Sequence, residues 1–117
     1  MTKSFTDITT HITAGTRKLR EAAPDAMNGF YAMSKGAMKP GVLSELDKEL
    51  IALAIGVAQH CDGCIGFHTK ALARLGAKRE QVMETLAVAV YMGGGPSLMY
   101  AAEAVHAFEE FTAAKAG

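Results

Sequence analysis

Apolar residues recur at intervals of three and four along most of this chain, which is the spacing of one face of an α-helix. The sequence does not alternate apolar and polar residues in the manner of a half-buried strand. Gly, Pro and helix-capping residues divide the pattern into segments. It predicts helices over residues 6–22, 25–35, 45–58, 62–75, 79–92 and 96–114. We therefore expect an all-α fold, a compact bundle of about six helices in a single domain over residues 1–117.

The third predicted helix is more apolar than a surface helix should be. Its apolar stripe, within residues 50–58, nearly encircles it. A helix that is apolar all round is buried on all sides. A chain of 117 residues has few layers to cover such a helix, so we expect a partner subunit to help.

Two other helices have faces that can be assigned from their spacing. Met27, Phe30, Tyr31 and Met33 supply the apolar side of the second helix, and Gly36 is expected to end it. On the last helix, the adjacent residues 109 and 110 are both glutamates and are expected to face solvent.

Charge and hydropathy exclude several classes of partner. Lys and Arg together equal Asp and Glu, 12 against 12, and no charge block stands out, so nothing indicates binding to nucleic acid or an anionic membrane. The longest apolar run is about nine residues, against ~20 for a membrane-spanning helix, and the polar N-terminus lacks a signal-peptide core. We expect a cytoplasmic protein whose neutral charge is compatible with self-association.

The candidate chemistry is concentrated in a Cys-x-x-Cys motif. Both cysteines of the protein lie in it, at Cys61 and Cys64. His60 precedes the pair and His68 follows Cys64 by four residues. A structural disulfide is not expected in a reducing compartment, so the pair indicates redox activity or metal binding. At the start of a helix, the partial positive charge favours the reactive thiolate, and the spacing lets the two sulfurs reach disulfide distance.

His68 is the candidate base for the pair. Residues four apart lie on the same face of a helix, so His68 could take a proton from Cys64 directly or through one water. Histidine side chains titrate near neutrality, as a proton shuttle must. Two roles are open for His60. It is an accessory catalytic residue, or it simply caps the end of the preceding helix.

Three interpretations of the motif remain open from the residues alone. A redox-active dithiol is favoured. A zinc site is the second, with Cys61, Cys64, His68 and His60 as up to four ligands, although structural zinc sites usually pair two such knuckles and this chain has one. The third is that the cysteines are two small buried apolar residues.

Glu49 is a further candidate, because it is a carboxylate in the first turns of a buried apolar helix. The alternative is that it lies exposed beside Lys48. Twelve residues of straight helix span ~18 Å, so Glu49 cannot reach Cys61 along one unbroken helix. Glu49 can act on the cysteines only if the helix bends, or if its side chain approaches them across a packed helix or a subunit interface.

Three segments of the sequence carry a family resemblance. They read KELIALA at 48–54, HCDGCIGFHTKA at 60–71 and LGA at 75–77. The sequence resembles the carboxymuconolactone decarboxylase superfamily, and more narrowly its alkylhydroperoxidase D-like branch, over about residues 46–92. The best-studied type in that branch often has His just before the second cysteine, where this chain has Gly63.

The resemblance implies an all-α, alkylhydroperoxidase D-like fold that assembles as a trimer or hexamer, and thiol-dependent reduction of peroxides. It implies that Cys64 attacks the peroxide, that Cys61 resolves the product, and that His68 and Glu49 occupy the proton-relay positions. An external dithiol of the lipoyl or thioredoxin type would regenerate the pair, without flavin, haem or metal. Two alternatives remain: a dithiol sensing or binding module without turnover, and a decarboxylase-like enzyme of other specificity.

Overall fold

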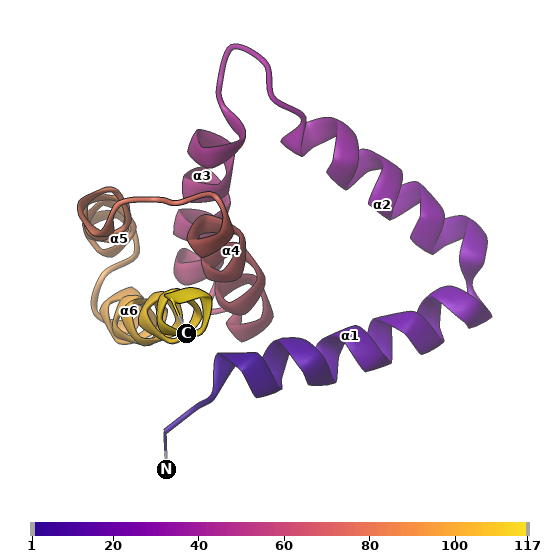
Figure 1. Cartoon of the computed structure of the whole chain (residues 1–117), viewed down its shortest axis with the longest axis horizontal. Helices are drawn as coiled ribbons and strands as arrows, with labels where there is room; N and C mark the ends of the chain where they lie inside the picture. Colours follow the sequence, from indigo (N-terminus) through magenta and orange to yellow (C-terminus); the bar gives the residue numbers. More distant parts are fainter. Residues whose placement is uncertain (1, 117) are drawn as a thin grey trace.

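The computed structural model describes residues 2–116, and these residues form an all-α fold without a strand (Figure 1). The helices are α1 (Phe5–Ala22), α2 (Pro24–Met38), α3 (Glu45–Ala58), α4 (Asp62–Arg74), α5 (Arg79–Gly93) and α6 (Gly95–Ala116). The predicted fold class is confirmed. Within these residues, no helix combines the length and the apolar character that crossing a membrane requires.

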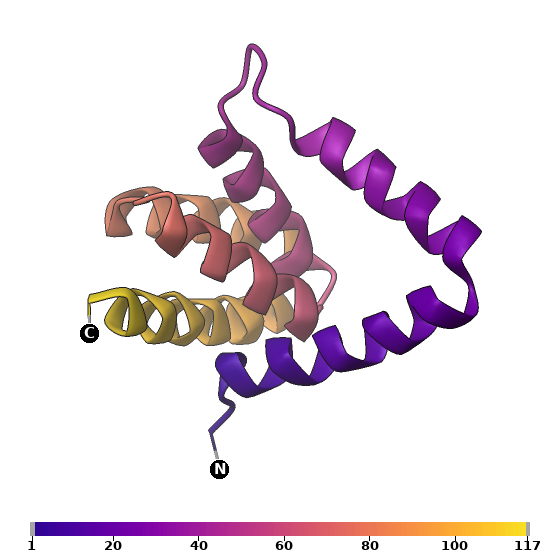
Figure 2. The ribbon, with the colours of Figure 1, turned by 45° about the vertical axis from the view of Figure 1, so that its right-hand side comes forward.

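The core lies between α3, α4, α5 and α6, and α4 packs against both α3 and α6 (Figures 1 and 2). The first residue of α1, Phe5, is fully buried in this core. The buried apolar side chains of the four bundle helices include Leu53, Val57, Ile65, Leu72, Val82, Leu86 and Phe108. Burying a side chain of this size stabilises the fold by about 1.5–3 kcal/mol.

Helix α2 behaves differently from its prediction. Gly36 was expected to end it, but the helix continues to Met38. It ends there because Lys39 precedes Pro40, and a residue before proline avoids the helical conformation. No residue of α2 is buried. Figure 2 shows α2 and the distal half of α1 as an arm beside the bundle, and the apolar side of α2 is accordingly exposed, with Phe30 at 49%.

The prediction that both glutamates of α6 face solvent is wrong for Glu110. This side chain is half-buried, and its two carboxylate oxygens accept hydrogen bonds from the backbone N–H of Phe5 at 2.9 Å and of Thr6 at 3.0 Å. The Ser4 hydroxyl donates a third at 3.0 Å. Burial alone would raise the pKa of Glu110, but the hydrogen bonds from these residues outweigh it and lower the pKa to about 2. Glu110 thus caps α1 and fastens it to the bundle.

Candidate active site

The connection between α3 and α4 is a tight turn that positions the dithiol. His60 has a left-handed backbone conformation, with φ at 58°. Its N–H donates to the carbonyl of Val57 at 3.1 Å, and the N–H of Cys61 donates to the carbonyl of Gly56 at 2.9 Å. This pair of bonds is the Schellman pattern that ends many helices, usually with Gly at the left-handed position. The turn allows α4 to begin directly beside the end of α3.

Cys61 is the N-cap residue of α4. Its Sγ accepts a hydrogen bond from the backbone N–H of Cys64 at 3.1 Å. The two cysteines form a disulfide, and their Cα atoms lie 5.3 Å apart. The structure therefore holds the oxidised form of the pair. After reduction, the Cys61 sulfur would face the free N–H groups of the helix start, where the positive end of the helix dipole favours a thiolate.

Glu49 and His68 meet across the packing of α3 against α4. The Oε2 atom of Glu49 lies 2.7 Å from Nδ1 of His68. Glu49 is buried, with 7% of its surface exposed, and the His68 side chain is 28% exposed. The alternative of an exposed Glu49 is therefore wrong. Glu49 meets His68 across the contact of two helices of the same chain, because α3 and α4 lie side by side (Figure 1).

Gly56 permits the close approach of α3 to the dithiol. A Cβ atom added at this position would lie 2.8 Å from the Cβ of Cys64, which is too short for two carbon atoms. Cys64 therefore packs directly against the backbone of α3, the helix that also carries Glu49. Because Cys64 and His68 are four residues apart on α4, they share one face of that helix.

His60 lies outside this arrangement. Its exposed ring stacks on Tyr100 of α6, with the centroids 4.6 Å apart and the planes 9° from parallel. The ammonium of Lys3 lies 5.3 Å from the centre of the same Tyr100 ring and 3.0 Å from the carboxylate of Asp62. The hydrogen bond to Asp62 raises the pKa of Lys3. His60 therefore belongs to a surface cluster formed by the N-terminal segment, the turn between α3 and α4, and α6. Sequence spacing does not predict this cluster.

The zinc-site interpretation finds no support in the geometry. Across residues 2–116, no three His, Cys, Asp or Glu side chains are grouped in a way that could hold a metal ion. Cys61 and Cys64 are bonded to each other, and His68 is paired with Glu49.

The fold and the site together define a helical protein with an oxidised dithiol at the start of α4 and a contact between the buried carboxylate of Glu49 on α3 and the half-buried imidazole of His68 on α4. The model of the carboxymuconolactone decarboxylase family matches residues 24–107. The chain belongs to this family. The match confirms the superfamily indicated by the sequence segments around the dithiol.

Two solved structures are similar to this chain. An apo carboxymuconolactone decarboxylase family protein from Legionella pneumophila is 55% identical, with a TM-score of 0.91 over 92% of this chain and 96% of its own. A family member from Thermotoga maritima, described as a possible participant in an antioxidative response, is 26% identical, with a TM-score of 0.79 over 89% and 92% of the two chains.

Two relatives known from sequence extend the comparison. A protein from Cupriavidus necator without an assigned function is 42% identical over 111 residues, which is 92% of this chain and 98% of the relative. A protein encoded in the cox locus of Paracoccus denitrificans, also without an assigned function, is 36% identical over 87 residues, or 74% and 78% of the two chains.

Proposed function

We propose that this protein is a thiol-dependent peroxidase of the alkylhydroperoxide reductase type. The observation that carries the proposal is the combination of a Cys61–Cys64 disulfide at the start of α4 with the Glu49–His68 pair beside it. A redox dithiol needs a base that can activate one thiol, and this site contains both. The antioxidative association of the Thermotoga maritima relative points in the same direction.

The proton step follows from the hydrogen bond between Glu49 and His68. A carboxylate accepts, so ionised Glu49 holds the proton of His68 on Nδ1 and leaves Nε2 unprotonated. Nε2 then takes the proton from the Cys64 thiol, directly or through one water. Glu49 acts through His68, as a positioning residue that fixes the tautomer and stabilises the charged imidazole.

The redox chemistry proceeds in two steps after Cys64 loses its proton. The thiolate attacks the terminal, OH-bearing oxygen of the hydroperoxide and the O–O bond breaks. Cys64 becomes a sulfenic acid, and the leaving alkoxide takes the proton from His68. The Cys61 thiol then attacks the sulfenic acid sulfur. A molecule of water leaves, and the Cys61–Cys64 disulfide of the structure is formed.

Regeneration requires an external dithiol of the lipoyl or thioredoxin type. Its thiolate attacks one sulfur of the Cys61–Cys64 disulfide, and its second thiol resolves the mixed disulfide, so that two electrons pass to the protein. Cys61 suits the leaving group, because the N–H of Cys64 already donates to its sulfur. No step draws on a flavin, a haem or a metal.

We further propose that the protein works as a homo-oligomer, a trimer or a hexamer. Large apolar side chains are exposed on α3, where Ile51 and Ile55 are 48% and 52% exposed, and at the end of α5, where Tyr91 and Met92 are 84% and 75% exposed. Apolar patches of this kind mark contact surfaces. They fit the expectation that a partner subunit covers part of α3.

The experiment that tests the proposal measures peroxide consumption at steady state. Reduced protein is supplied with cumene hydroperoxide and excess dihydrolipoamide, or with a thioredoxin system. A peroxidase consumes many equivalents of peroxide per chain. A sensing module stops after one equivalent with its disulfide formed, and a decarboxylase-like enzyme of other specificity consumes none, so either result would refute the proposal.

A further inference from the structure

Asp62 places a negative charge directly beside the dithiol. It follows Cys61 in the sequence and is the first residue of α4, so its Cα lies about 3.8 Å from that of Cys61. A carboxylate at this distance disfavours a second negative charge, and it therefore opposes ionisation of the Cys61 thiol after reduction. The positive end of the helix dipole favours the same thiolate. Two opposing influences thus act on Cys61.

Lys3 supplies a counter-charge for Asp62 from the N-terminal segment. Its Nζ donates to Oδ1 of Asp62 at 3.0 Å, although 59 residues separate the two in sequence. The ammonium also lies 5.3 Å from the centre of the Tyr100 ring, on which His60 stacks. The hydrogen bond with Asp62 raises the pKa of Lys3, and Glu103 of α6 adds a further attraction. Lys3 therefore keeps its positive charge at the place where it offsets the charge of Asp62.

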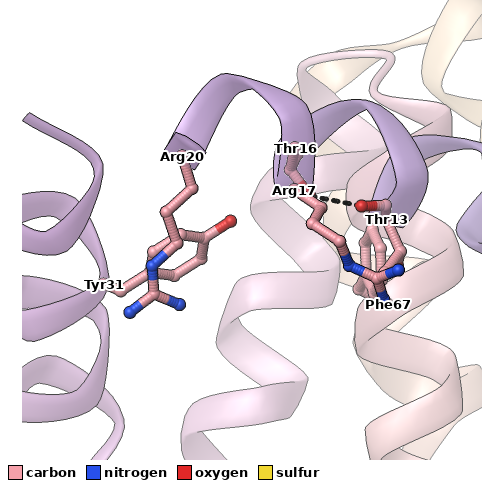
Figure 3. Close-up of a pocket in the computed structure, with 6 residues that line it drawn as sticks. All are labelled: Thr13, Thr16, Arg17, Arg20, Tyr31 and Phe67. Carbon is pink, nitrogen blue, oxygen red and sulfur yellow. Dashed lines mark hydrogen bonds between the residues drawn. The ribbon is translucent and has the colours of Figure 1, made fainter. Parts of the chain in front are cut away.

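The cations in the distal half of α1 are placed differently. Figure 3 shows Arg17 and Arg20 on opposite sides of a groove between the arm and the bundle, and neither cysteine lines this groove. Among the ion pairs within residues 2–116, only the pair formed by Lys3 includes a residue of the Cys-x-x-Cys motif. Lys3 is therefore the cation whose position couples it to the dithiol.

We propose that Lys3 controls the redox equilibrium of the Cys61–Cys64 pair by neutralising Asp62. Lys3 is a positioning residue, because it acts through Asp62 to stabilise the Cys61 thiolate of the reduced protein. A dithiol whose reduced form is stabilised is a stronger oxidant, so loss of the ammonium should make the disulfide harder to reduce. The effect is electrostatic and does not require the cluster to be open to a ligand. It rests on the reversible dithiol of the proposed function, but on no step that involves peroxide.

The test equilibrates the full-length protein with mixtures of reduced and oxidised dithiothreitol at pH 8, where a thiol at a helix start is largely ionised. In this exchange the Cys61–Cys64 bond breaks and a disulfide forms in dithiothreitol. Two electrons and two protons pass to the protein, and the Cys61 thiol releases one of these protons to solvent. The reduced fraction, measured by alkylation and mass spectrometry, gives the equilibrium constant for reduction.

The two single variants should shift this equilibrium constant in opposite directions. Lys3→Gln should lower it about threefold and Asp62→Asn should raise it about threefold, the size of a screened charge effect. A threefold change is about 14 mV for a two-electron couple. The double variant should return to within about twofold of the wild type. Lys3→Arg keeps the charge and should match the wild type.

Lys70→Gln is the matched control. It removes a cation from α4 itself, about 12 Å along the helix from Asp62, which is beyond the ~10 Å screening length at 0.1 M salt. It should change the equilibrium constant by less than about 1.5-fold. The Lys3 and Asp62 side chains are 39% and 37% exposed, so their variants should fold.

The opposite signs distinguish a charge effect from a structural one. If the ion pair only fastened the N-terminal segment, Lys3→Gln and Asp62→Asn would lose the same contact and shift the equilibrium in the same direction. That result would overturn the proposal, as would a shift in Lys3→Gln no larger than that in Lys70→Gln. If the wild-type disulfide does not exchange with dithiothreitol, the proposed function fails together with this proposal. If the wild type exchanges and the variants do not differ from it, only this proposal fails.

Discussion

The carboxylate of Glu49 lies 2.7 Å from Nδ1 of His68, although 19 residues separate them in sequence. The contact exists because α3 and α4 are joined by a short turn and pack side by side. It couples a buried carboxylate to a half-buried imidazole four residues from Cys64. In the proposed mechanism, this contact allows a thiol to be activated near neutral pH.

Glu49→Gln preserves the size of the side chain but removes its negative charge. We expect the peroxidase kcat/KM to fall about 10- to 100-fold, because His68 loses the group that orients and stabilises it. The loss should shrink above about pH 8.5, where a free thiol ionises without a base. Glu45→Gln is the control, as it removes an exposed carboxylate of the same helix that pairs with Arg74. Equal activity of Glu49→Gln and Glu45→Gln at neutral pH would exclude the relay.

Gly56→Ala tests the close approach of α3 to the dithiol. The added Cβ would lie 2.8 Å from the Cβ of Cys64, so the helices must separate. We expect a loss of about 1–3 kcal/mol in the free energy of unfolding, measured by urea denaturation, together with slower peroxide turnover. Gly15→Ala is the matched control: it meets no atom within 4 Å and should stabilise α1 by up to about 1 kcal/mol. An unchanged stability of Gly56→Ala would contradict the packing described.

His60→Gly and His60→Ala separate the two contributions of this residue. Both variants lose the stacking on Tyr100, but only glycine adopts φ of 58° without strain. The Gly variant should therefore be more stable than the Ala variant by about 1 kcal/mol. Equal stability in thermal unfolding would mean that the turn relaxes. Because His60 stacks on Tyr100 at the surface, the Gly variant should also retain most of the peroxidase activity.

Glu110 gives the fold a specific acid sensitivity. Its pKa is about 2 in the folded protein, below the ordinary value of 4.5, so the unfolded state binds the proton more readily. The stabilisation is complete above pH 4.5 and is lost as the pH falls toward 2. At pH 7, Glu110→Gln should cost about 1–2 kcal/mol, a value that allows for partial solvent exposure. The difference from the wild type should vanish near pH 2.

Glu109→Gln is the control for this prediction. Glu109 pairs with Arg79 at the surface, with both side chains about half exposed, so its loss should change stability by less than about 1 kcal/mol. If Glu110→Gln behaves like Glu109→Gln between pH 7 and pH 3, Glu110 does not cap α1 in solution.

Much of the fold could be predicted from the sequence because local signals agree with the final packing. The predicted start of α3 at residue 45 is confirmed, and the residue before it, Ser44, caps the helix by accepting a hydrogen bond from the N–H of Asp47 at 3.0 Å. The start of α4 at the dithiol follows from spacing in the same way. These features depend on neighbours in sequence, and helical periodicity reports them directly.

Other features depend on contacts between distant segments. Glu110 caps a helix whose first residue, Phe5, lies 105 positions earlier, and its neighbour Glu109 has the same side chain without that role. Helix length shows that Glu49 cannot reach the cysteines along one straight helix. It does not show that Glu49 contacts His68 of the neighbouring helix. No helical period carries information of this kind.

The most direct test of the central claim locates the sulfenic acid in cysteine variants. Reduced Cys61→Ser and Cys64→Ser are each treated with one equivalent of cumene hydroperoxide and a dimedone trap, and the labelled residue is identified by mass spectrometry. We predict one adduct on Cys64 in Cys61→Ser, none on Cys61 in Cys64→Ser, and no dithiol-dependent turnover in either. An adduct on Cys61, or wild-type peroxide consumption by Cys64→Ser, would contradict the claim that Cys64 is the attacking thiol.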